Sequence, residues 1–400
     1  MVDLELTTTQ KQVKEFAHQF ALHVVRPASL QADRDHALPP SLLERLAELR
    51  KLMSGGDTAT DYDGSGGGRE TPRLGPSQRN RTTLIGAEEM AWGDGSVLLS
   101  MPGPGLGGPP VLMTGTPEQR TRFMAVFDKP GVRWGAYGLT EPGAGSDVSA
   151  IRTTCRKDGD SWILDGRKCY ITNGARAEWV VIFATVDPSL GRAGHRAFVV
   201  ERGTPGFSVG KIEEKMGLCA SETAELVLDG CRVPGDNLLG GEAHYAGKEG
   251  FMAAMKTFDS SRPMVGSVAV GIARASLEAA ADFVRSDYAL ARHTPRYALL
   301  SSLLADDARR LDAARLMCWR AAWMADEGLP NAREASMAKA YAAEVAMRVC
   351  ADAVQVLGAH GLESSRFVEK WYRDIKVFDI FEGTAQIQRI VIAKRILRGQ

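Results

Sequence analysis

The chain lacks an excess of charge of either sign, and it lacks a long apolar run. Its 49 Lys and Arg residues balance its 49 Asp and Glu residues, so the net charge implies neither a nucleic-acid partner nor a membrane surface. No apolar run approaches the roughly 20 residues that span a bilayer. The opening residues lack the basic and apolar segments of a signal peptide. We therefore expect a cytoplasmic protein with no nucleic-acid partner and no membrane span.

Cysteine is sparse, and its spacing argues against a metal site. The six cysteines form no Cys-x-x-Cys pair and no His/Cys cluster at zinc spacing. In a chain of 400 residues without a secretion signal, reduced thiols are expected. We predict no metal, and the length favours two or three packed units.

The first 132 residues are predicted to form a helical domain. Apolar residues recur at helical spacing over residues 8–52, with a break at Pro39-Pro40, and the pattern resumes over residues 84–92. Between them, residues 54–76 are polar and rich in glycine, which predicts a flexible surface loop.

A glycine motif follows in residues 101–110. Gly103, Gly105 and Gly108 match the spacing G-x-G-x-x-G. A dinucleotide site needs a strand before these glycines and a helix after them within a βαβ unit. Prolines and helical patterns surround them instead, so we interpret this stretch as a loop or pocket wall.

The pattern changes at Trp134 to short β-branched or aromatic runs separated by turn pairs such as Asp158-Gly159, Asp165-Gly166 and Asp229-Gly230. No helical pattern intervenes. Residues 133–245 are therefore predicted to form an antiparallel β-sandwich or barrel. The expected strands are 151–156, 162–164, 170–172, 179–185, 197–200 and 226–228.

Helical patterns return over residues 246–400. Long patterns cover residues 265–290, 299–324 and 334–357, and a closing helix is expected over 385–397. Alanine-rich faces allow close packing, which predicts a four- or five-helix bundle. The fold class is thus α+β and multidomain, in the order helical, β, helical bundle.

Glu382 is the most informative residue of the C-terminal part. It follows the apolar pair Ile380-Phe381 and precedes Gly383-Thr384, which suits a tight turn and a helix N-cap. A carboxylate between an apolar wall and a glycine turn is placed to be desolvated. Taken alone, the stretch also fits an ordinary acidic residue beside a helix start.

Two stretches of the β region could bind a ligand. In Tyr137–Asp147, Thr140 and Ser146 offer hydroxyls, and the glycines free backbone N–H groups to form an anion-binding nest. In Tyr170–Gly174 an aromatic residue and Thr172 precede a turn. Each stretch alone also fits an ordinary turn or hairpin end.

Together with residues 258–263, 353–361 and 372–389, these stretches resemble the acyl-CoA dehydrogenase family. The resemblance extends from about Val13 to Arg398. It implies an FAD-dependent oxidation of an acyl-CoA thioester to the trans-2-enoyl-CoA, with electron-transfer flavoprotein as acceptor. FAD would lie between the β domain and the C-terminal bundle.

The resemblance also implies roles for particular residues. Glu382 matches the catalytic base, which removes the α-proton while the β-hydrogen leaves as a hydride to flavin N5. The position used as base in other branches holds Ser261, which cannot do this work. The substrate would be bound by Ser146, Asp259, Arg262, Phe381 and Gly383. The flavin would be contacted by Tyr137, Thr140, Ser146, Tyr170, Thr172, Thr384 and Gln386.

The remaining cofactor contacts are implied for the other half of FAD. Gln355, Gly358 and Ala359 would meet the adenosine half from a neighbouring subunit, and Arg292 and Thr294 are possible pyrophosphate contacts. The segment 292–297 is shorter than the matching segment of many relatives, and it lacks the Phe-Gly pair and the glutamine that those relatives carry. A homodimer or homotetramer is therefore one expectation, and a hetero-oligomer with a sister subunit is another.

Two rival functions keep the same fold. The chain could be a flavin oxidase or monooxygenase that passes electrons to oxygen, or an FAD-sharing subunit without catalysis of its own. Glu382 and the two flavin stretches favour the dehydrogenase. The acyl group cannot be read from the sequence, and a carrier-protein thioester is a further alternative to CoA.

Overall fold

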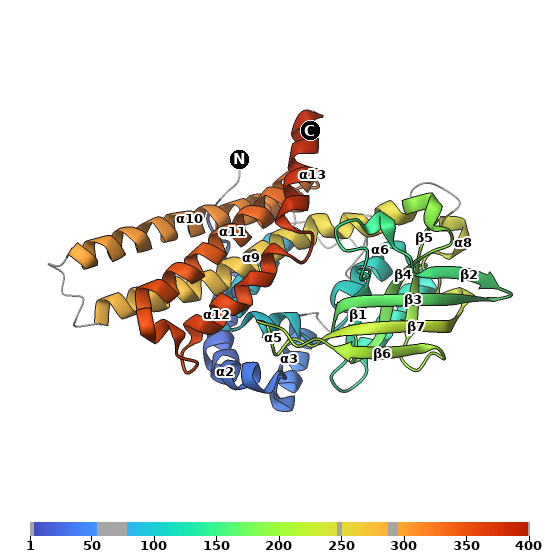
Figure 1. Ribbon diagram of the computed structural model, residues 1–400, viewed down its shortest axis with the longest axis horizontal. Helices are drawn as coiled ribbons and strands as arrows, with labels where there is room; N and C mark the ends of the chain where they lie inside the picture. The colour runs from blue at the N-terminus through green and yellow to red at the C-terminus, as the bar shows by residue number, and fades with distance from the viewer. Residues whose placement is uncertain (1–3, 54–77, 246–249, 287–294, 399–400) are drawn as a thin grey trace.

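The computed structural model describes residues 4–53, 78–245, 250–286 and 295–398. A long helical bundle forms one half of the molecule and a curled β-sheet forms the other (Figure 1). N-terminal helices α2 (Arg26–Asp35) and α3 (Pro40–Met53) lie beneath the bundle in that view. This order of helical, β and helical units is the predicted fold class.

Helix α1 (Thr8–Phe20) begins at a recognisable cap. The Thr7 side chain accepts from the Gln10 backbone N–H and the Gln10 side chain accepts from that of Thr7, so a capping box starts α1. The predicted loop over residues 54–76 lies outside the described residues. The other helices of this part are α1 (Thr8–Phe20), α4 (Arg79–Gly93), α5 (Gly95–Leu99), α6 (Gly108–Thr114) and α7 (Pro117–Met124).

The sheet has seven strands in the order β1-β4-β2-β3-β7-β6, with β5 paired to β4. Most neighbours are antiparallel, but β1 runs parallel to β4, and β2 meets β4 in parallel at Thr154 and Thr185. The strands are β1 (Trp134–Gly138), β2 (Thr154–Asp158), β3 (Ser161–Thr172), β4 (Ala177–Thr185), β5 (His195–Glu201), β6 (Phe207–Ile212) and β7 (Thr223–Pro234).

Two predicted turns proved wrong, because they lie within strands. Asp165-Gly166 falls inside β3, where the pairing with β7 shifts register between Leu164 and Gly166. Gly166 has φ 154°, so the residue pair forms an irregularity in a continuous strand instead of ending it. Asp229-Gly230 likewise lies inside β7. The predicted strands 162–164 and 170–172 are therefore one strand, and β6 was not predicted.

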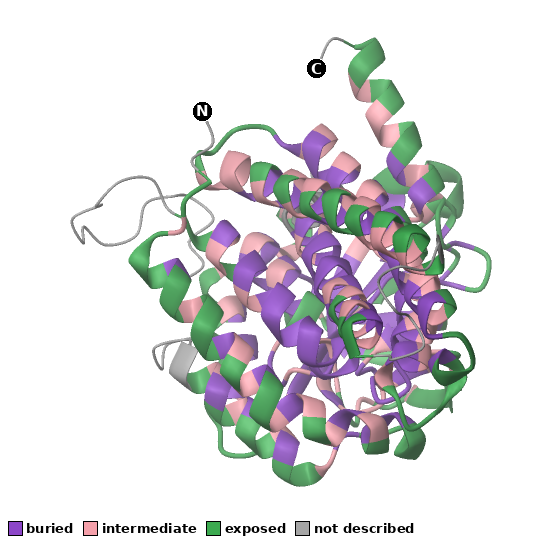
Figure 2. Ribbon diagram, turned by 90° about the vertical axis from the view of Figure 1, so that its left-hand side faces the viewer, coloured by how far each residue is buried: buried purple, intermediate pink, exposed green. Residues whose placement is uncertain are grey.

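The C-terminal bundle is built on an alanine-rich core. Fully buried alanines from three helices, such as Ala269, Ala314 and Ala342, allow the backbones to approach closely. Buried residues concentrate in the inner helices, whereas α13 (Ala385–Leu397) projects from the body and is largely exposed towards its end (Figure 2). The remaining helices are α8 (Gly241–His244), α9 (Gly250–Ser286), α10 (Pro295–Asp326), α11 (Ala332–Leu357) and α12 (Phe367–Ile375).

Helix α9 is the apolar centre of this bundle. Within the described residues, its segment Ser261–Ser286 has the length and hydropathy of a membrane span, but 67% of the apolar window is buried inside the fold. A helix that is apolar on most sides and packed among α4, α10 and α11 is what a bundle core requires.

Candidate active site

The turn that carries Glu382 has an unusual backbone. Glu382 has φ 56° and Gly383 has φ 87°, so two consecutive residues are left-handed. For a residue with a Cβ this conformation costs roughly 1–2 kcal/mol. Thr384 then caps α13, because its hydroxyl accepts from the Ile387 backbone N–H at 3.3 Å. The sequence predicted the glycine turn and the cap, but it gave no sign that Glu382 itself is left-handed.

The Glu382 carboxyl group meets one hydroxyl group. Ser261 Oγ donates to Glu382 Oε2 at 2.9 Å. Burial raises the pKa of Glu382 above its ordinary value, against the opposing effects of the Ser261 hydrogen bond and the charges of Arg262 and Lys339. Ser261, which the sequence analysis set against Glu382 as the alternative base position, is thus a hydrogen-bond donor to that acid.

Two side chains that the sequence did not single out hold the carbonyls of this turn. Lys339, from α11, donates from Nζ to the Gly383 carbonyl at 2.8 Å. Gln388, from α13, donates from Nε2 to the carbonyls of Glu382 at 3.2 Å and Gly383 at 3.0 Å. Both side chains are buried, and α11 and α13 pack together. Neither motif nor spacing marks these residues, since their roles depend on the approach of two helices.

The loop that begins at Thr140 is held by hydrogen bonds on one side and is open to solvent at its glycines. Cys169 N–H donates to the Thr140 carbonyl at 2.9 Å, which places the loop beside the end of β3. Beneath it, Lys168 Nζ donates to Glu141 Oε1 at 2.6 Å, and both side chains are buried. A Cβ on Gly143 or Gly145 would meet nothing within 4 Å, so that side of the loop faces open space.

Tyr170 lies near the end of β3 and Tyr137 lies on β1, and these two strands contact each other. Tyr170 has φ 58° and is 67% exposed, which is unusual for an aromatic residue at the end of a buried strand. Thr172 is half-buried two residues later. Tyr137 packs against Phe183, with ring centroids 5.1 Å apart. Burial, followed by the charge of Glu382, raises the pKa of Tyr137, so β1 approaches the acidic turn.

The structure does not bring all the predicted site residues together. Gln355, Gly358 and Ala359 are exposed near the C-terminal end of α11. Lys339 contacts the Glu382–Gly383 turn from the other end of the same helix, about 24 Å away at 1.5 Å per residue. The predicted cofactor contacts of one chain therefore form two separate groups.

The other predicted site residues differ in exposure, and some of them lie outside the part of the chain that the structure describes. Ser146 and Gln386 are exposed, Arg262 and Phe381 are half-buried, and Phe381 packs edge-on against Phe378 with centroids 4.9 Å apart. Arg292 and Thr294 lie outside the described residues. Asp259 belongs to α9, but its side chain lies outside the described part.

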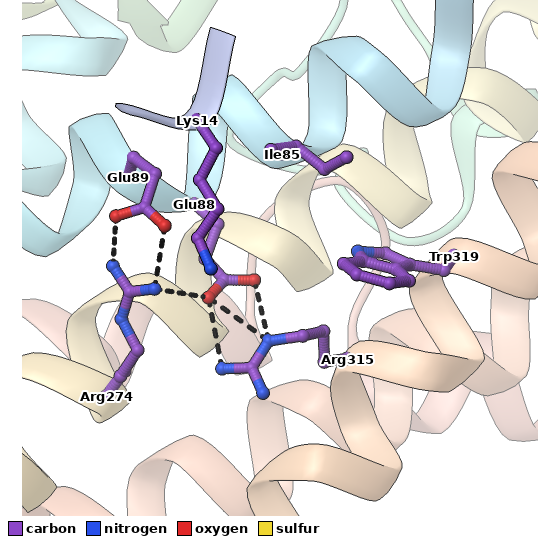
Figure 3. A pocket seen from close by; sticks show the side chains of 7 residues that line it. All are labelled: Lys14, Ile85, Glu88, Glu89, Arg274, Arg315 and Trp319. Atoms are coloured by element: carbon purple, nitrogen blue, oxygen red, sulfur yellow. Dashed lines mark hydrogen bonds and ion pairs between the residues drawn. The ribbon is translucent and has the colours of Figure 1, made fainter. Parts of the chain in front are cut away.

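A charged cavity lies elsewhere, between the N-terminal helices and the bundle. Its volume is about 330 Å³, and Figure 3 shows Glu88 and Glu89 directed towards Arg274 and Arg315 across it. Glu88 Oε2 lies 3.0 Å from Arg315 Nε, and Glu89 Oε1 lies 2.8 Å from Arg274 Nη1. These opposite charges pair with one another and link α4 to α9 and α10.

Family models match the chain along its length. The N-terminal domain of acyl-CoA dehydrogenase matches residues 7–127, the middle domain residues 136–231 and the C-terminal domain residues 248–397. The chain belongs to the acyl-CoA dehydrogenase family.

Similar proteins cover the same span. The chain is 35% identical over 399 residues to acryloyl-CoA reductase (NADH) of Anaerotignum propionicum, covering 99% of this chain and 96% of that protein. It is 36% identical to the mitochondrial short-chain specific acyl-CoA dehydrogenase of Rattus norvegicus, covering 99% and 92%. A solved structure on the electron transferring flavoprotein of Acidaminococcus fermentans contains a chain 36% identical to this one, with a TM-score of 0.85 and coverage of 99% and 100%.

As a member of the acyl-CoA dehydrogenase family, the chain is an FAD-dependent oxidoreductase. Its own residues fit a flavin. Tyr170 is exposed, Thr140 and Thr172 are half-buried, and one side of the glycine loop is open, so these groups are accessible to a ligand. We refer to them together as the flavin surface. An aromatic face and a row of hydroxyl and backbone donors are the groups that a flavin ring requires.

Proposed function

We propose that this dehydrogenase oxidises short-chain acyl-CoA thioesters to trans-2-enoyl-CoA, with Glu382 as the catalytic base. The observation that carries the proposal is the placement of Glu382. It is an acid with a raised pKa, held by one serine hydroxyl at the boundary between the bundle and the flavin surface. The short-chain preference is supported by similarity to the rat short-chain enzyme.

Glu382 would remove the α-proton of the thioester. An α-proton is far less acidic than a carboxylic acid, so a base with a raised pKa reduces the mismatch between donor and acceptor. Bound FAD would accept the β-hydrogen as a hydride. Phe381 and Ile380 border the acid with apolar surface, and an acyl chain that covers them would expel water and raise the pKa of Glu382 further.

Arg262 and Gly383 would hold the substrate in place. Arg262 lies close enough to Glu382 for its charge to lower the pKa of that acid. Gly383 is half-exposed beside the base. We assign Ser146 and Asp259 to the CoA side, as the family resemblance implies.

The flavin is proposed to be shared between subunits. Tyr137, Thr140, Tyr170 and Thr172 of one chain would hold the flavin ring. The group at the far end of α11, about 24 Å from the Lys339 end, would hold the adenosine half of a second subunit's FAD. Exposed apolar residues on the projecting helix α13, Ile390 and Leu397, support a contact with another chain. A homo-oligomer is the simplest such assembly.

Electron-transfer flavoprotein is the proposed acceptor, and the cytoplasm is the proposed location. The acceptor is supported by the similarity to a chain in the structure on the Acidaminococcus electron transferring flavoprotein. All six cysteines are free thiols, which fits a reducing compartment and supports the location.

Anaerobic mixing with an acyl-CoA panel tests this function. Butyryl-CoA should bleach the flavin and yield the trans-2-enoyl product, and bleaching should weaken as the acyl chain lengthens. Electron-transfer flavoprotein should restore the yellow colour. No bleaching by any acyl-CoA would contradict the proposal. Rapid peroxide release in air would favour the oxidase instead.

A second candidate is the reverse direction, which similarity to acryloyl-CoA reductase favours. The same acid would then return a proton to the α-carbon of an enoyl thioester. Reduced enzyme mixed with acryloyl-CoA would reoxidise faster than it does with electron-transfer flavoprotein if reduction is the physiological direction.

A further inference from the structure

Lys339 is a buried cation without a carboxylate partner. Its side chain is 1% exposed, and among the described residues no carboxylate lies within ion-pair distance of Nζ. The other fully buried lysines differ in this respect: Lys168 pairs with Glu141 at 2.6 Å and Lys370 with Asp374 at 2.5 Å. A desolvated ammonium is costly unless a specific contact compensates. For Lys339 that contact is a backbone carbonyl beside the proposed base.

The carbonyl belongs to the left-handed turn. Lys339 Nζ lies 2.8 Å from Gly383 O, and Gln388 Nε2 reaches the same oxygen at 3.0 Å from the opposite helix. Glu382, with φ 56°, is the strained residue that these contacts must hold. Strained residues persist only where surrounding contacts over-determine them, and such strain is typical of functional sites.

We propose that Lys339 is a positioning residue for the base: its ammonium group holds the Glu382–Gly383 turn in place through the Gly383 carbonyl. This inference rests on the proposed role of Glu382 in catalysis. The contact that Lys339 makes is with the backbone of the turn, at the Gly383 carbonyl. Lys339 acts through the turn and through its charge.

The charged neighbours of Lys339 come from each element packed around it. Asp379 and Glu382 precede α13, Arg262 lies on α9, and Gln388 on α13 is neutral. Burial lowers the pKa of Lys339 to about 8, with Asp379 and Glu382 acting to raise it and Arg262 to lower it. The ammonium is therefore present below about pH 8 and is lost above it. Its loss weakens the hold on Gly383.

The test compares three variants of the purified flavoprotein. Lys339→Met removes the charge and the donor, Lys339→Arg keeps a charge that does not titrate below pH 12, and Lys376→Met removes a half-exposed lysine from the segment just before the turn. Infrared difference titration follows protonation of the Glu382 carboxyl, assigned by the signal that Glu382→Gln lacks. Anaerobic flavin reduction is followed in parallel over pH.

Lys339→Met should raise the titration midpoint of Glu382 by about 1 pH unit, because a nearby positive charge is lost. It should also lower kcat by about 10²-fold with a smaller change in KM, as expected for a misplaced base. Lys339→Arg should keep the wild-type midpoint and lose the decline in rate above about pH 8. Lys376→Met removes a more exposed charge, which pairs with Asp379 at 3.9 Å, and should change both quantities far less.

An unchanged Glu382 midpoint in Lys339→Met, or an equal shift in Lys376→Met, would overturn the inference. If Lys339→Met does not fold, Lys339→Arg decides: a decline in rate near pH 8 that persists in that variant contradicts a role for the Lys339 charge. If no acyl-CoA reduces the wild-type flavin, the proposed function fails, whereas the infrared midpoints still report on Lys339.

Discussion

Acidic side chains have opposite surroundings at two sites: the cavity between the helical units, and the Glu382 turn. In the cavity, Arg274 and Arg315 neutralise Glu88 and Glu89 (Figure 3). Burial acts to raise the pKa of Glu89, but the hydrogen bond and charge of Arg274 bring it below its ordinary value. At the turn, Glu382 has one serine hydroxyl and no ion pair among the described residues, and its pKa is raised.

The difference separates an acid that stabilises the fold from an acid that can exchange protons. A fully paired carboxylate stays charged and contributes through its partners. A carboxylate left without a counter-ion in an apolar turn is poised to take a proton at a useful pH. Desolvation alone does not distinguish the two, because it acts to raise the pKa of Glu89 as well as that of Glu382.

Removing the unpaired acid should have the largest effect on activity. Glu382→Gln keeps the shape of the side chain but cannot remove a proton, so flavin reduction should fall by about 10³-fold, within the range for a general base. The protein should remain folded and yellow and should still bind acyl-CoA, as measured by spectral titration of the flavin. Glu344→Gln makes the same change at an exposed residue of α11 and should react like wild type. Equal rates for both variants would contradict the assignment.

Removing an arginine from the cluster of Glu88, Glu89, Arg274 and Arg315 should lower stability and leave activity unchanged. Arg274→Met leaves Glu89 buried without its main partner, which should cost about 3–5 kcal/mol in the free energy of unfolding. Urea denaturation measures this loss. Arg285→Met removes an exposed arginine from the same helix and should cost less than about 1 kcal/mol. The rate of flavin reduction per bound flavin should not change, and a large fall in that rate would weaken the comparison.

A change in the turn itself should affect both properties moderately. Gly383→Ala places a Cβ 2.5 Å from Gln388 Nε2 in a residue with φ 87°. The left-handed conformation alone should cost roughly 1–2 kcal/mol, and displacement of Gln388 should slow flavin reduction by about 10-fold. Gly131 has φ 97° and open space around it, so Gly131→Ala carries the strain without the clash. That variant should lose stability alone, measured by urea denaturation beside stopped-flow reduction.

Asp307 is a second acid whose charge is only partly compensated, and replacing it should have the smallest effect of these variants. Asp307 is fully buried in α10, and burial and the neighbouring Asp352 raise its pKa to about 6 despite Arg348. An acid whose pKa is raised on folding stabilises the fold when protonated, so this contribution falls as pH rises from about 4 to about 6. Asp307→Asn should therefore raise stability at pH 7 by about 1–2 kcal/mol and flatten this pH dependence.

The control for this prediction is the adjacent Asp306, which pairs with Arg309 and Arg310 and has a lowered pKa. Asp306→Asn should change stability much less than Asp307→Asn does, and in the opposite direction. Neither variant should alter flavin reduction, because neither acid lies at the flavin surface. A loss of stability in Asp307→Asn at pH 7 would show that its charge is compensated after all.

The sequence predicted the helices better than the sheet, for a physical reason. The closing helix over residues 385–397 is confirmed, because its cap, apolar spacing and basic end are all local signals. The Asp-Gly pairs of β3 and β7 were wrongly predicted to be turns, because Asp-Gly also fits an irregular strand. Only the pairing with a neighbouring strand distinguishes a turn from such an irregularity. The exposed strand β6 carries little apolar signal.

The site divides in the same way. Glu382, Thr140 and Tyr170 stand in local motifs and could be named from the sequence. Lys339 and Gln388 could not, because their contacts with the turn arise only when α11 and α13 pack together. The left-handed backbone of Glu382 could not be predicted either, since glutamate is not a residue type that favours this conformation.

Proton removal by Glu382 can be measured apart from hydride transfer. A thioester without a β-hydrogen, such as acetyl-CoA, offers α-protons but cannot reduce the flavin. In D₂O, mass spectrometry should find deuterium at the α-carbon with wild-type enzyme and only background exchange with Glu382→Gln. Equal exchange in the two proteins would contradict the claim that this unpaired acid is the base.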